Sequence, residues 1–77
     1  MDVNAEFLSE YKRIGLNVLF YRRKLGLTQD ELARKADISR SRISDIECYK
    51  GPYSVETVLR ISHALGIDVS KIFEDKE

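Results

Sequence analysis

Short polar side chains line one side of a segment that is predicted to be helical. At roughly 100° per residue, Ser41, Ser44 and Asp45 lie opposite Ile43 and Ile46. Hydroxyl and carboxylate groups form hydrogen bonds with base edges and phosphates, so this side could bind nucleic acid. Most short amphipathic helices, however, have a polar face that is only solvated. The surrounding sequence has to decide between the two interpretations.

Two arginines extend the same polar face. Arg40 and Arg42 lie near the N-terminal end of the segment, and both can donate hydrogen bonds to bases or phosphates. The isoleucines on the opposite side would anchor the helix in a core. A helix of about ten residues with short outward side chains also fits the width of a DNA major groove. The pattern therefore favours a helix that enters that groove.

A second short helix is predicted immediately before this one. Thr28 is a favourable N-cap residue, and Glu31 three positions later completes a capping box. Apolar residues then recur at helical spacing: Leu32, Ala33 and Ala36. This helix is therefore predicted to bury one stripe against a core.

A tight break separates the two helices. Asp37 and Ile38 interrupt the apolar pattern, and Ser39 supplies a second N-cap residue. Two capped helices joined by so short a turn cannot run parallel, so the angle between them is fixed. This is the geometry of a helix-turn-helix, whose second helix lies in the major groove.

A long helix from about Ala5 to Leu25 is predicted to precede this unit, and Gly26 is the stop expected at its C-terminus. Its core stripe consists of Phe7, Tyr11, Ile14, Val18, Tyr21 and Leu25. Three apolar residues are surplus to that stripe: Leu16, Leu19 and Phe20. They belong either to a wide apolar face that packs on two sides or to a patch for a partner subunit.

The stretch 49–53 is predicted to be a loop, because it contains glycine and proline. It begins where the polar helix ends, so Lys50 and the loop N–H groups can reach the sugar-phosphate strand. Tyr49 or Tyr53 could donate its hydroxyl to a phosphate or pack against the next helix. The loop thus extends the same candidate surface.

Two more helices are predicted after the loop. Ser54 caps the first, and Gly66 ends it. Its inward-facing residues are Val58, Ile61, Ala64 and Leu65. Asp68 is expected to cap a last short helix, and the acidic tail 74–77 is expected to be loose.

From Ile14 to Phe73 the chain resembles the XRE family of helix-turn-helix proteins, which includes phage repressor and Cro proteins. The matching stretches are 14–18, 22–29, 31–33, 38–41, 43–44, 46–47, 54–58 and 64–67. They occur in the order and spacing of the family and span about four-fifths of the chain. The resemblance implies an all-α bundle of five helices of the lambda-repressor type. It also implies sequence-specific binding to double-stranded DNA.

The resemblance assigns base-facing positions to Arg40, Ser41 and Asp45. Asp45 could accept a hydrogen bond from a cytosine amino group, orient Arg42 or repel incorrect sequences. Gln29 would touch a phosphate and brace Arg40. The residues expected to contact the DNA backbone are Thr28, Gln29, Arg42, Ser44 and Lys50.

Arg22 and Glu47 match a pair that forms a buried ion pair between the first and third helices of the family. A buried guanidinium or carboxylate needs such a partner.

The resemblance also implies a homodimer that forms through the C-terminal end of the chain. The last helix is too short to be stable without tertiary packing. Four apolar residues there are not expected to fit all together under a five-helix core: Ile67, Val69, Ile72 and Phe73. A two-fold dimer would place two recognition helices about 34 Å apart on one face of the DNA.

The chain departs from the family pattern around the recognition helix. Asp37 replaces a common turn glycine, although aspartate tolerates left-handed backbone better than most residues. Cys48 and Tyr49 replace a basic residue and a glycine, and Tyr53 stands where proline is common. These departures affect the loop conformation and its phosphate contacts rather than the fold.

Length and composition predict one small soluble domain, residues 1–77 with a core at about 7–73. The chain has 77 residues, of which 43% are hydrophobic and 34% charged. It contains no membrane-spanning run or signal peptide, so we expect a cytoplasmic protein. A single cysteine excludes an internal disulfide and a multi-cysteine zinc site. We expect no metal and no cofactor.

The net charge of zero argues against nucleic-acid binding, but the distribution of charge answers part of that objection. Residues 22–50 carry eight lysines and arginines against five acids, whereas residues 51–77 carry three against five. The basic excess lies in the helix-turn-helix segment. Because the excess is small, non-specific affinity for DNA should be weak.

Three rival interpretations remain. An enzyme is disfavoured, because His63 lacks a neighbouring carboxylate and nucleophile. A protein-interaction module, such as an antitoxin that binds a toxin or a phage protein that binds an antagonist, overlaps with DNA binding and is the serious alternative. Cys48 is either an oxidant sensor or a small hydrophobic residue. We expect a dimeric repressor rather than an activator, because so short a chain leaves no room for an activation domain.

Overall fold

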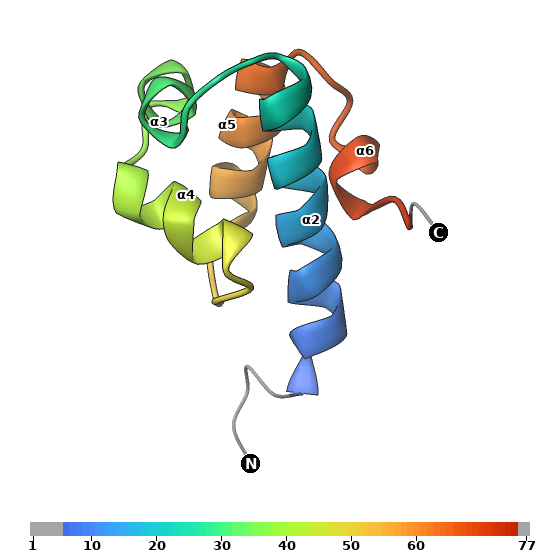
Figure 1. The fold of residues 1–77 in the computed structure, drawn as a ribbon. Helices are drawn as coiled ribbons and strands as arrows, with labels where there is room; N and C mark the ends of the chain where they lie inside the picture. Colours follow the sequence, from blue (N-terminus) through green and yellow to red (C-terminus); the bar gives the residue numbers. More distant parts are fainter. Residues whose placement is uncertain (1–5, 76–77) are drawn as a thin grey trace.

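The computed structural model describes residues 6–75, and in that range the fold is all-α, as predicted (Figure 1). The helices are α2 (Leu8–Lys24), α3 (Gln29–Ala36), α4 (Arg40–Glu47), α5 (Val55–Leu65) and α6 (Ser70–Phe73). The first helix was expected to start near Ala5, and both that residue and the end of the acidic tail lie outside the described residues. Within residues 6–75, every helix is too short or too polar to cross a membrane.

All three predicted serine and threonine caps are present. Thr28 Oγ1 accepts the backbone N–H of Glu31 at 3.0 Å, and the Glu31 carboxylate accepts that of Thr28 at 2.8 Å. This completes the capping box of α3. Ser39 Oγ accepts the N–H of Arg42 at 3.0 Å at the start of α4, and Ser54 caps α5 in the same way. Local side-chain chemistry therefore sets where these helices begin.

Left-handed backbone ends the helices where the sequence predicted a stop. Gly26 follows α2 with φ 71°, and Gly66 follows α5 with φ 70°. Asp37 occupies the turn between α3 and α4 with φ 57°. It therefore adopts the left-handed conformation for which a glycine is common at this place.

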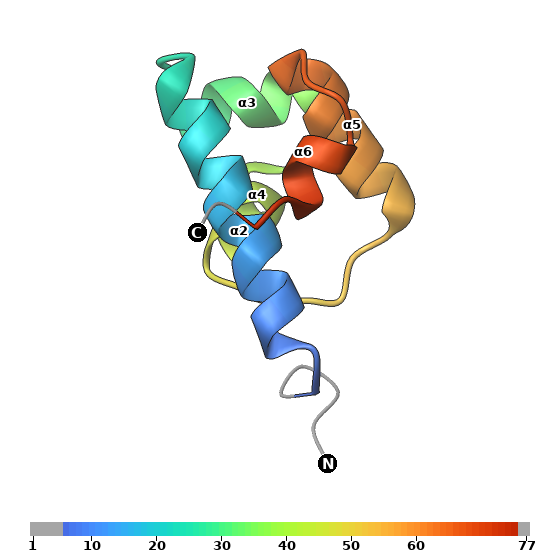
Figure 2. The same cartoon turned by 90° about the vertical axis from the view of Figure 1, so that its right-hand side faces the viewer.

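α2 lies between two flanks of the bundle, with α4 on one side and α6 on the other (Figures 1 and 2). α3 and α5 complete the core. Its buried apolar side chains are Ile14, Val18, Leu32, Ala33, Ala36, Ile43, Ile46, Val58, Ile61, Leu65 and Ile72. The predicted inward residues of α3, α4 and α5 are all buried or packed against this cluster.

Two residues of the predicted stripe on α2 lie outside the core. Phe7 and Leu25 are exposed, whereas Tyr11 and Tyr21 are half-buried. Helical periodicity continues along the whole of α2, but the other helices cover only its middle (Figure 1). The prediction for Phe7 and Leu25 was therefore wrong.

The C-terminal residues also pack differently from the prediction. Ile72 has an exposed fraction of 0%, and Ile67 and Val69 pack against the core, so only Phe73 is exposed. The core accommodates Ile72 because Asn17 Nδ2 donates to the carbonyl oxygens of Ile72 and Glu74, both at 2.7 Å. Ile72 is therefore unavailable for a dimer interface, which corrects that assignment.

Asp68 was predicted to cap the last helix, but the N-cap of α6 is Val69, which forms no capping hydrogen bond through its side chain, and Asp68 stands one residue before it. The Asp68 carboxylate accepts the backbone N–H of Ser70 at 2.9 Å, and this hydrogen bond lowers the pKa of the Asp68 carboxyl. A helix of four residues has little stability of its own, so this bond and the burial of Ile72 hold it in place.

Candidate nucleic-acid interface

The orientation of α4 is fixed by its two isoleucines. Ile43 and Ile46 are fully buried, and the opposite side of the helix faces outward. Arg40, Ser41 and Arg42 are exposed on that side. The geometry predicted from the spacing of these residues is therefore present in the structure.

The outward side chains of this face are not engaged elsewhere in the domain. Within residues 6–75, the side chains of Arg40, Ser41, Asp45 and Lys50 form no hydrogen bond or ion pair. Four arginines elsewhere on the surface and in the core do pair with carboxylates: Arg13, Arg22, Arg34 and Arg60. The polar groups of α4 are thus available to a ligand.

Two residues of the predicted face are less exposed than the others. Ser44 and Asp45 are half-buried, because the chain turns back directly after α4. The backbone N–H of Lys50 donates to the carbonyl oxygen of Asp45 at 2.8 Å, while the Lys50 side chain remains exposed. Lys50 therefore lies beside the end of α4, on the predicted surface.

An ion pair ties α4 to α2. Arg22 Nε donates to Glu47 Oε2 at 2.6 Å and Arg22 Nη2 donates to Glu47 Oε1 at 3.0 Å, with exposed side-chain fractions of 12% and 6%. This is the pair that the family resemblance implied. The hydrogen bond with Glu47 raises the pKa of the Arg22 guanidinium. Arg22 Nη1 also donates to the carbonyl oxygen of Leu27 at 2.8 Å, so the pair also holds the segment before α3.

Gln29 joins this network rather than forming the predicted contact. Its Nε2 donates to Glu47 Oε1 at 3.0 Å, whereas the resemblance implied that it would brace Arg40. Thr28, directly before it, is exposed at the N-terminus of α3. The N-terminus of α3 is therefore fixed relative to the C-terminal end of α4 through one carboxylate.

Gly15 allows α2 and α4 to approach closely, which the sequence analysis missed. A Cβ at this position would collide with the carbonyl oxygen of Ile46 and approach the ring of Tyr49 to 2.9 Å. Tyr49 itself has φ 66°. A glycine in the middle of a helix was the available signal, because it often marks such an approach.

The two loop tyrosines both pack toward α2. The ring centroids of Tyr53 and Tyr11 lie 5.6 Å apart, and the Tyr53 hydroxyl is buried without a hydrogen-bond partner among the described residues. Burial raises the pKa of Tyr53 to about 12. Of the two roles considered for Tyr53, the structure supports packing, and its ring contacts Tyr11 of α2 and the core cluster.

The other residues that could act chemically are Cys48 and His63. Cys48 is exposed at the end of α4, not buried as a small hydrophobic residue would be, and His63 is exposed on α5. In the range 6–75, no three histidine, cysteine or carboxylate side chains are placed to hold one metal ion.

Comparison with known proteins agrees with this geometry. The helix-turn-helix family matches residues 20–72. The immunity repressor protein of Bacillus phage phi105 is 41% identical over 59 residues, which are 77% of this chain and 41% of the relative. The chain thus spans about two-fifths of that relative.

Solved structures share the fold. The restriction-modification controller protein C.AhdI from Aeromonas hydrophila superposes with a TM-score of 0.81 at 25% identity, over 84% of this chain and 98% of that one. The N-terminal DNA binding domain of SinR from Bacillus subtilis gives 0.76 at 29% identity, over 83% and 94%.

The chain belongs to the helix-turn-helix family, in its XRE-type branch. Its fold is that of the lambda-repressor-like group.

Proposed function

We propose that this protein is a dimeric repressor that acts in the cytoplasm and reads a palindromic operator through the major groove. The observation that carries the proposal is the polar face of α4, which is anchored by Ile43 and Ile46 and has no partners within the described part of the domain. The phage immunity repressor supports repression as the outcome of binding.

Contacts to DNA divide into base reading and backbone positioning. Arg40, Ser41 and Asp45 read base edges, because they lie on the outward side of α4 or at its margin. Five residues around them position the duplex through its phosphates: Thr28, Gln29, Arg42, Ser44 and Lys50. Gln29 can do so while its amide nitrogen remains on Glu47, since its side-chain oxygen accepts hydrogen bonds and a bridging water can reach a phosphate.

The two subunits meet at the C-terminal end of the chain, in a contact that does not include the buried Ile72. Phe73 is exposed, and Ile67 and Val69 are half-buried at the same end of the chain. These three residues form the proposed subunit contact. A two-fold arrangement then places the α4 helices of two subunits about 34 Å apart on successive turns of the duplex.

Selection of duplexes from a random pool, followed by fluorescence anisotropy over a range of salt concentrations, tests the proposal. The recovered site should be a palindrome, and the affinity should fall steeply with salt because bound cations are released from the phosphates. Failure to enrich any sequence, or binding that does not respond to salt, would contradict the proposal.

Two substitutions separate base reading from backbone contact. Arg40→Ala should relax preference at one base pair, at a cost of about 1–3 kcal/mol on the cognate site and little on random duplex. Lys50→Ala should weaken all duplexes alike and reduce the salt slope by about 1. Lys35→Ala is the matched control, because it removes an exposed lysine at the C-terminal end of α3, beside α5 and outside the proposed DNA and subunit contacts. Equal losses of Arg40→Ala on cognate and random duplex would refute its base-reading role.

A protein-interaction module that keeps the helix-turn-helix, as in antitoxins or repressors controlled by a protein antagonist, is the second candidate. The observation in its favour is the net charge of zero, which gives little general attraction to DNA. Salt-insensitive or absent binding to every duplex would favour this function.

A further inference from the structure

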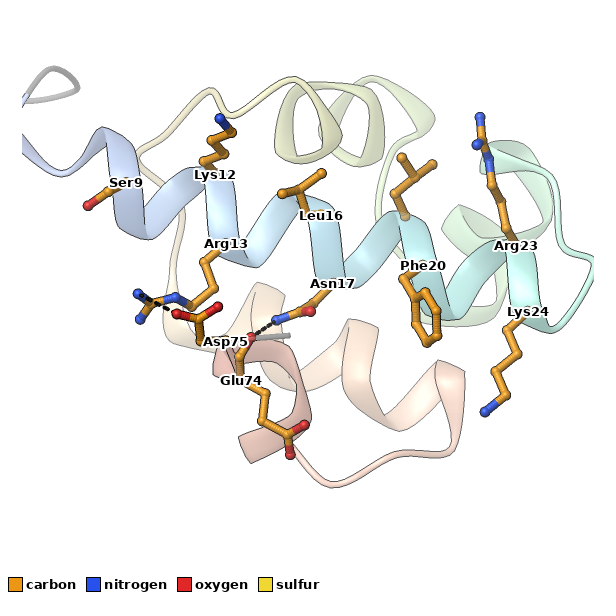
Figure 3. Close-up of a pocket in the computed structure, with 11 residues that line it drawn as sticks. Ser9, Lys12, Arg13, Leu16, Asn17, Phe20, Arg23, Lys24, Glu74 and Asp75 are labelled. Carbon is orange, nitrogen blue, oxygen red and sulfur yellow. Dashed lines mark hydrogen bonds and ion pairs between the residues drawn. The ribbon is translucent and has the colours of Figure 1, made fainter. Parts of the chain in front are cut away.

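The outer face of α2 has an apolar centre between two pairs of cations. Leu16 and Phe20, four residues apart and therefore on one side of the helix, have exposed fractions of 45% and 46%. They line a groove of about 960 Å³. Lys12 and Arg13 border it at one end, and the second pair of cations borders it at the other end (Figure 3).

The second pair consists of Arg23 and Lys24, which follow the first pair by eleven residues. At 1.5 Å per residue, the two pairs are about 16 Å apart, or three helical turns. The positions 12–13, 16, 19–20 and 23–24 recur every three to four residues, so they form one continuous stripe along α2.

The C-terminal segment forms one wall of the groove. Asn17 in the floor holds this segment by donating to the Glu74 carbonyl oxygen, and the Asp75 carboxylate lies 4.0 Å from Arg13 Nη2 (Figure 3). The chain's own carboxylate thus already lies beside one of the cations. Both side chains of this pair are well exposed, so the contact is weak and a competing carboxylate can replace it.

We propose that this groove binds an amphipathic helix of a different protein, with apolar residues at its centre and carboxylates at both ends. The apolar centre gives the burial that drives helix-in-groove recognition. The flanking cations select acidic ends and fix the register of the bound helix. This inference does not depend on DNA binding by α4.

Charge disfavours a second copy of α2 as the occupant. A two-fold axis that lays the apolar centre on itself places Leu16 opposite Phe20, but it also places Lys12 opposite Lys24 and Arg13 opposite Arg23. A parallel copy would set each cation beside its equivalent. Both arrangements place like charges together, which disfavours them.

The position of the groove leaves the recognition helix accessible. The C-terminal wall and α4 lie on different flanks of α2 (Figure 1). A helix bound in the groove therefore does not cover the outward side chains of α4. The partner can bind the repressor on DNA as well as in solution.

A designed peptide tests the proposal on the full chain. The probe is a fluorescent helix of about 14 residues, or four turns, with leucines at positions i, i+4 and i+7 and glutamates at both ends. The control peptide has lysines in place of the glutamates. Anisotropy should show that the acidic peptide binds at least about tenfold more tightly than the control. Its affinity should decrease with salt.

Variants of the groove then localise the binding. Phe20→Ser and Leu16→Ser should each weaken the acidic peptide at least about tenfold, because each removes a buried apolar side chain from the complex. Leu59→Ser, at an exposed leucine of α5, is the matched control and should have no effect. Arg23→Glu combined with Lys24→Glu should abolish the preference between the two peptides, because one end of the groove then selects carboxylates and the other end selects lysines. Thermal unfolding of each variant verifies that it is folded.

Several outcomes would overturn the proposal. These are equal or absent binding of the two peptides, or acidic-peptide binding that the groove variants leave unchanged. Groove variants that weaken duplex binding as much as Lys50→Ala would assign the cations to DNA. Sedimentation that shows groove variants dissociating a dimer would assign the groove to a second copy.

Discussion

The two flanks of α2 are packed by different kinds of contact. Against α4, α2 offers the bare backbone of Gly15 and the charged head of Arg22, which meet a carbonyl oxygen and a nearly buried carboxylate. Against α6, it offers one amide, Asn17, which donates to two backbone carbonyl oxygens, while Ile72 fills the core. The flank that carries α4 therefore depends on individual side-chain identities. The other flank depends mainly on backbone groups and burial.

Loss of the carboxylate on the α4 flank should have the largest effect. Glu47→Ala leaves the Arg22 guanidinium nearly buried without its partner and also removes the acceptor of Gln29. We expect the free energy of unfolding to fall by about 3–5 kcal/mol in urea denaturation.

The control for this variant is another carboxylate–arginine pair. Glu56→Ala removes the partner of Arg60, at 2.9 Å but on the exposed surface of α5, and should cost less than about 1 kcal/mol. Similar losses for the two variants would show that burial does not distinguish the pairs, and the contrast between the flanks would weaken.

A methyl group added where α2 and α4 approach most closely should cause the next largest loss of stability. Gly15→Ala places a Cβ against the Ile46 carbonyl oxygen, which belongs to the backbone and cannot rotate away. Unfolding free energy should fall by about 2–3 kcal/mol. Gly26→Ala is the control: it has open space but φ 71°, so only backbone strain of about 1 kcal/mol opposes it. A smaller loss at Gly15 than at Gly26 would contradict the steric account.

A single substitution should destabilise the packing of α6 against α2 without affecting α4. Asn17→Ala leaves the carbonyl oxygens of Ile72 and Glu74 without their donor and should cost about 1–2 kcal/mol. Amide hydrogen exchange should show faster exchange in Ser70–Phe73 while α4 keeps its protection. Equal loss of protection in both helices would show that the flanks are coupled rather than separately fixed.

The smallest effect at neutral pH is expected for the loop after α4. Tyr53→Phe removes a buried hydroxyl that has no partner among the described residues, so stability should change by less than about 0.5 kcal/mol. At high pH the two proteins should differ. The pKa of Tyr53 is about 12 in the fold and about 10 when unfolded, so the unfolded chain loses this proton first.

The contribution of Tyr53 to the free energy of unfolding is therefore fully present below pH 10, and it is lost as the pH rises towards 12. Urea denaturation across this range should show that loss in the unmodified protein and a smaller one in Tyr53→Phe. Absorbance of tyrosinate should show one fewer group titrating near pH 12 in the variant. Parallel pH profiles for the two proteins would contradict burial as the cause of the raised pKa.

Features encoded within a few residues were predictable from the sequence. Thr28, Ser39 and Ser54 cap the helices as predicted, because an N-cap needs only a side chain and the next turn. Asp37 adopts the left-handed turn for the same local reason. The outward face of α4 followed from the positions of two isoleucines.

Features that depend on distant contacts were not predictable in the same way. Phe7 continues the apolar stripe of α2, but periodicity does not tell where the covering helices end. Ile72 is buried by the packing of α6 against α2, which is distant in sequence, so its own apolar neighbours did not predict that burial. Asn17 is a polar residue amid apolar ones, so an apolar pattern gives no signal for it. The partner of Gln29 likewise depends on where α4 places Glu47.

The exposed thiol of Cys48 has a practical consequence. It is the one cysteine of the chain, and it stands at the C-terminal end of the recognition helix. A spin label or fluorophore attached there marks a single site in each subunit without any engineering of the sequence. In the proposed assembly, the distance between two such labels would give the spacing of the recognition helices directly, both free in solution and on an operator.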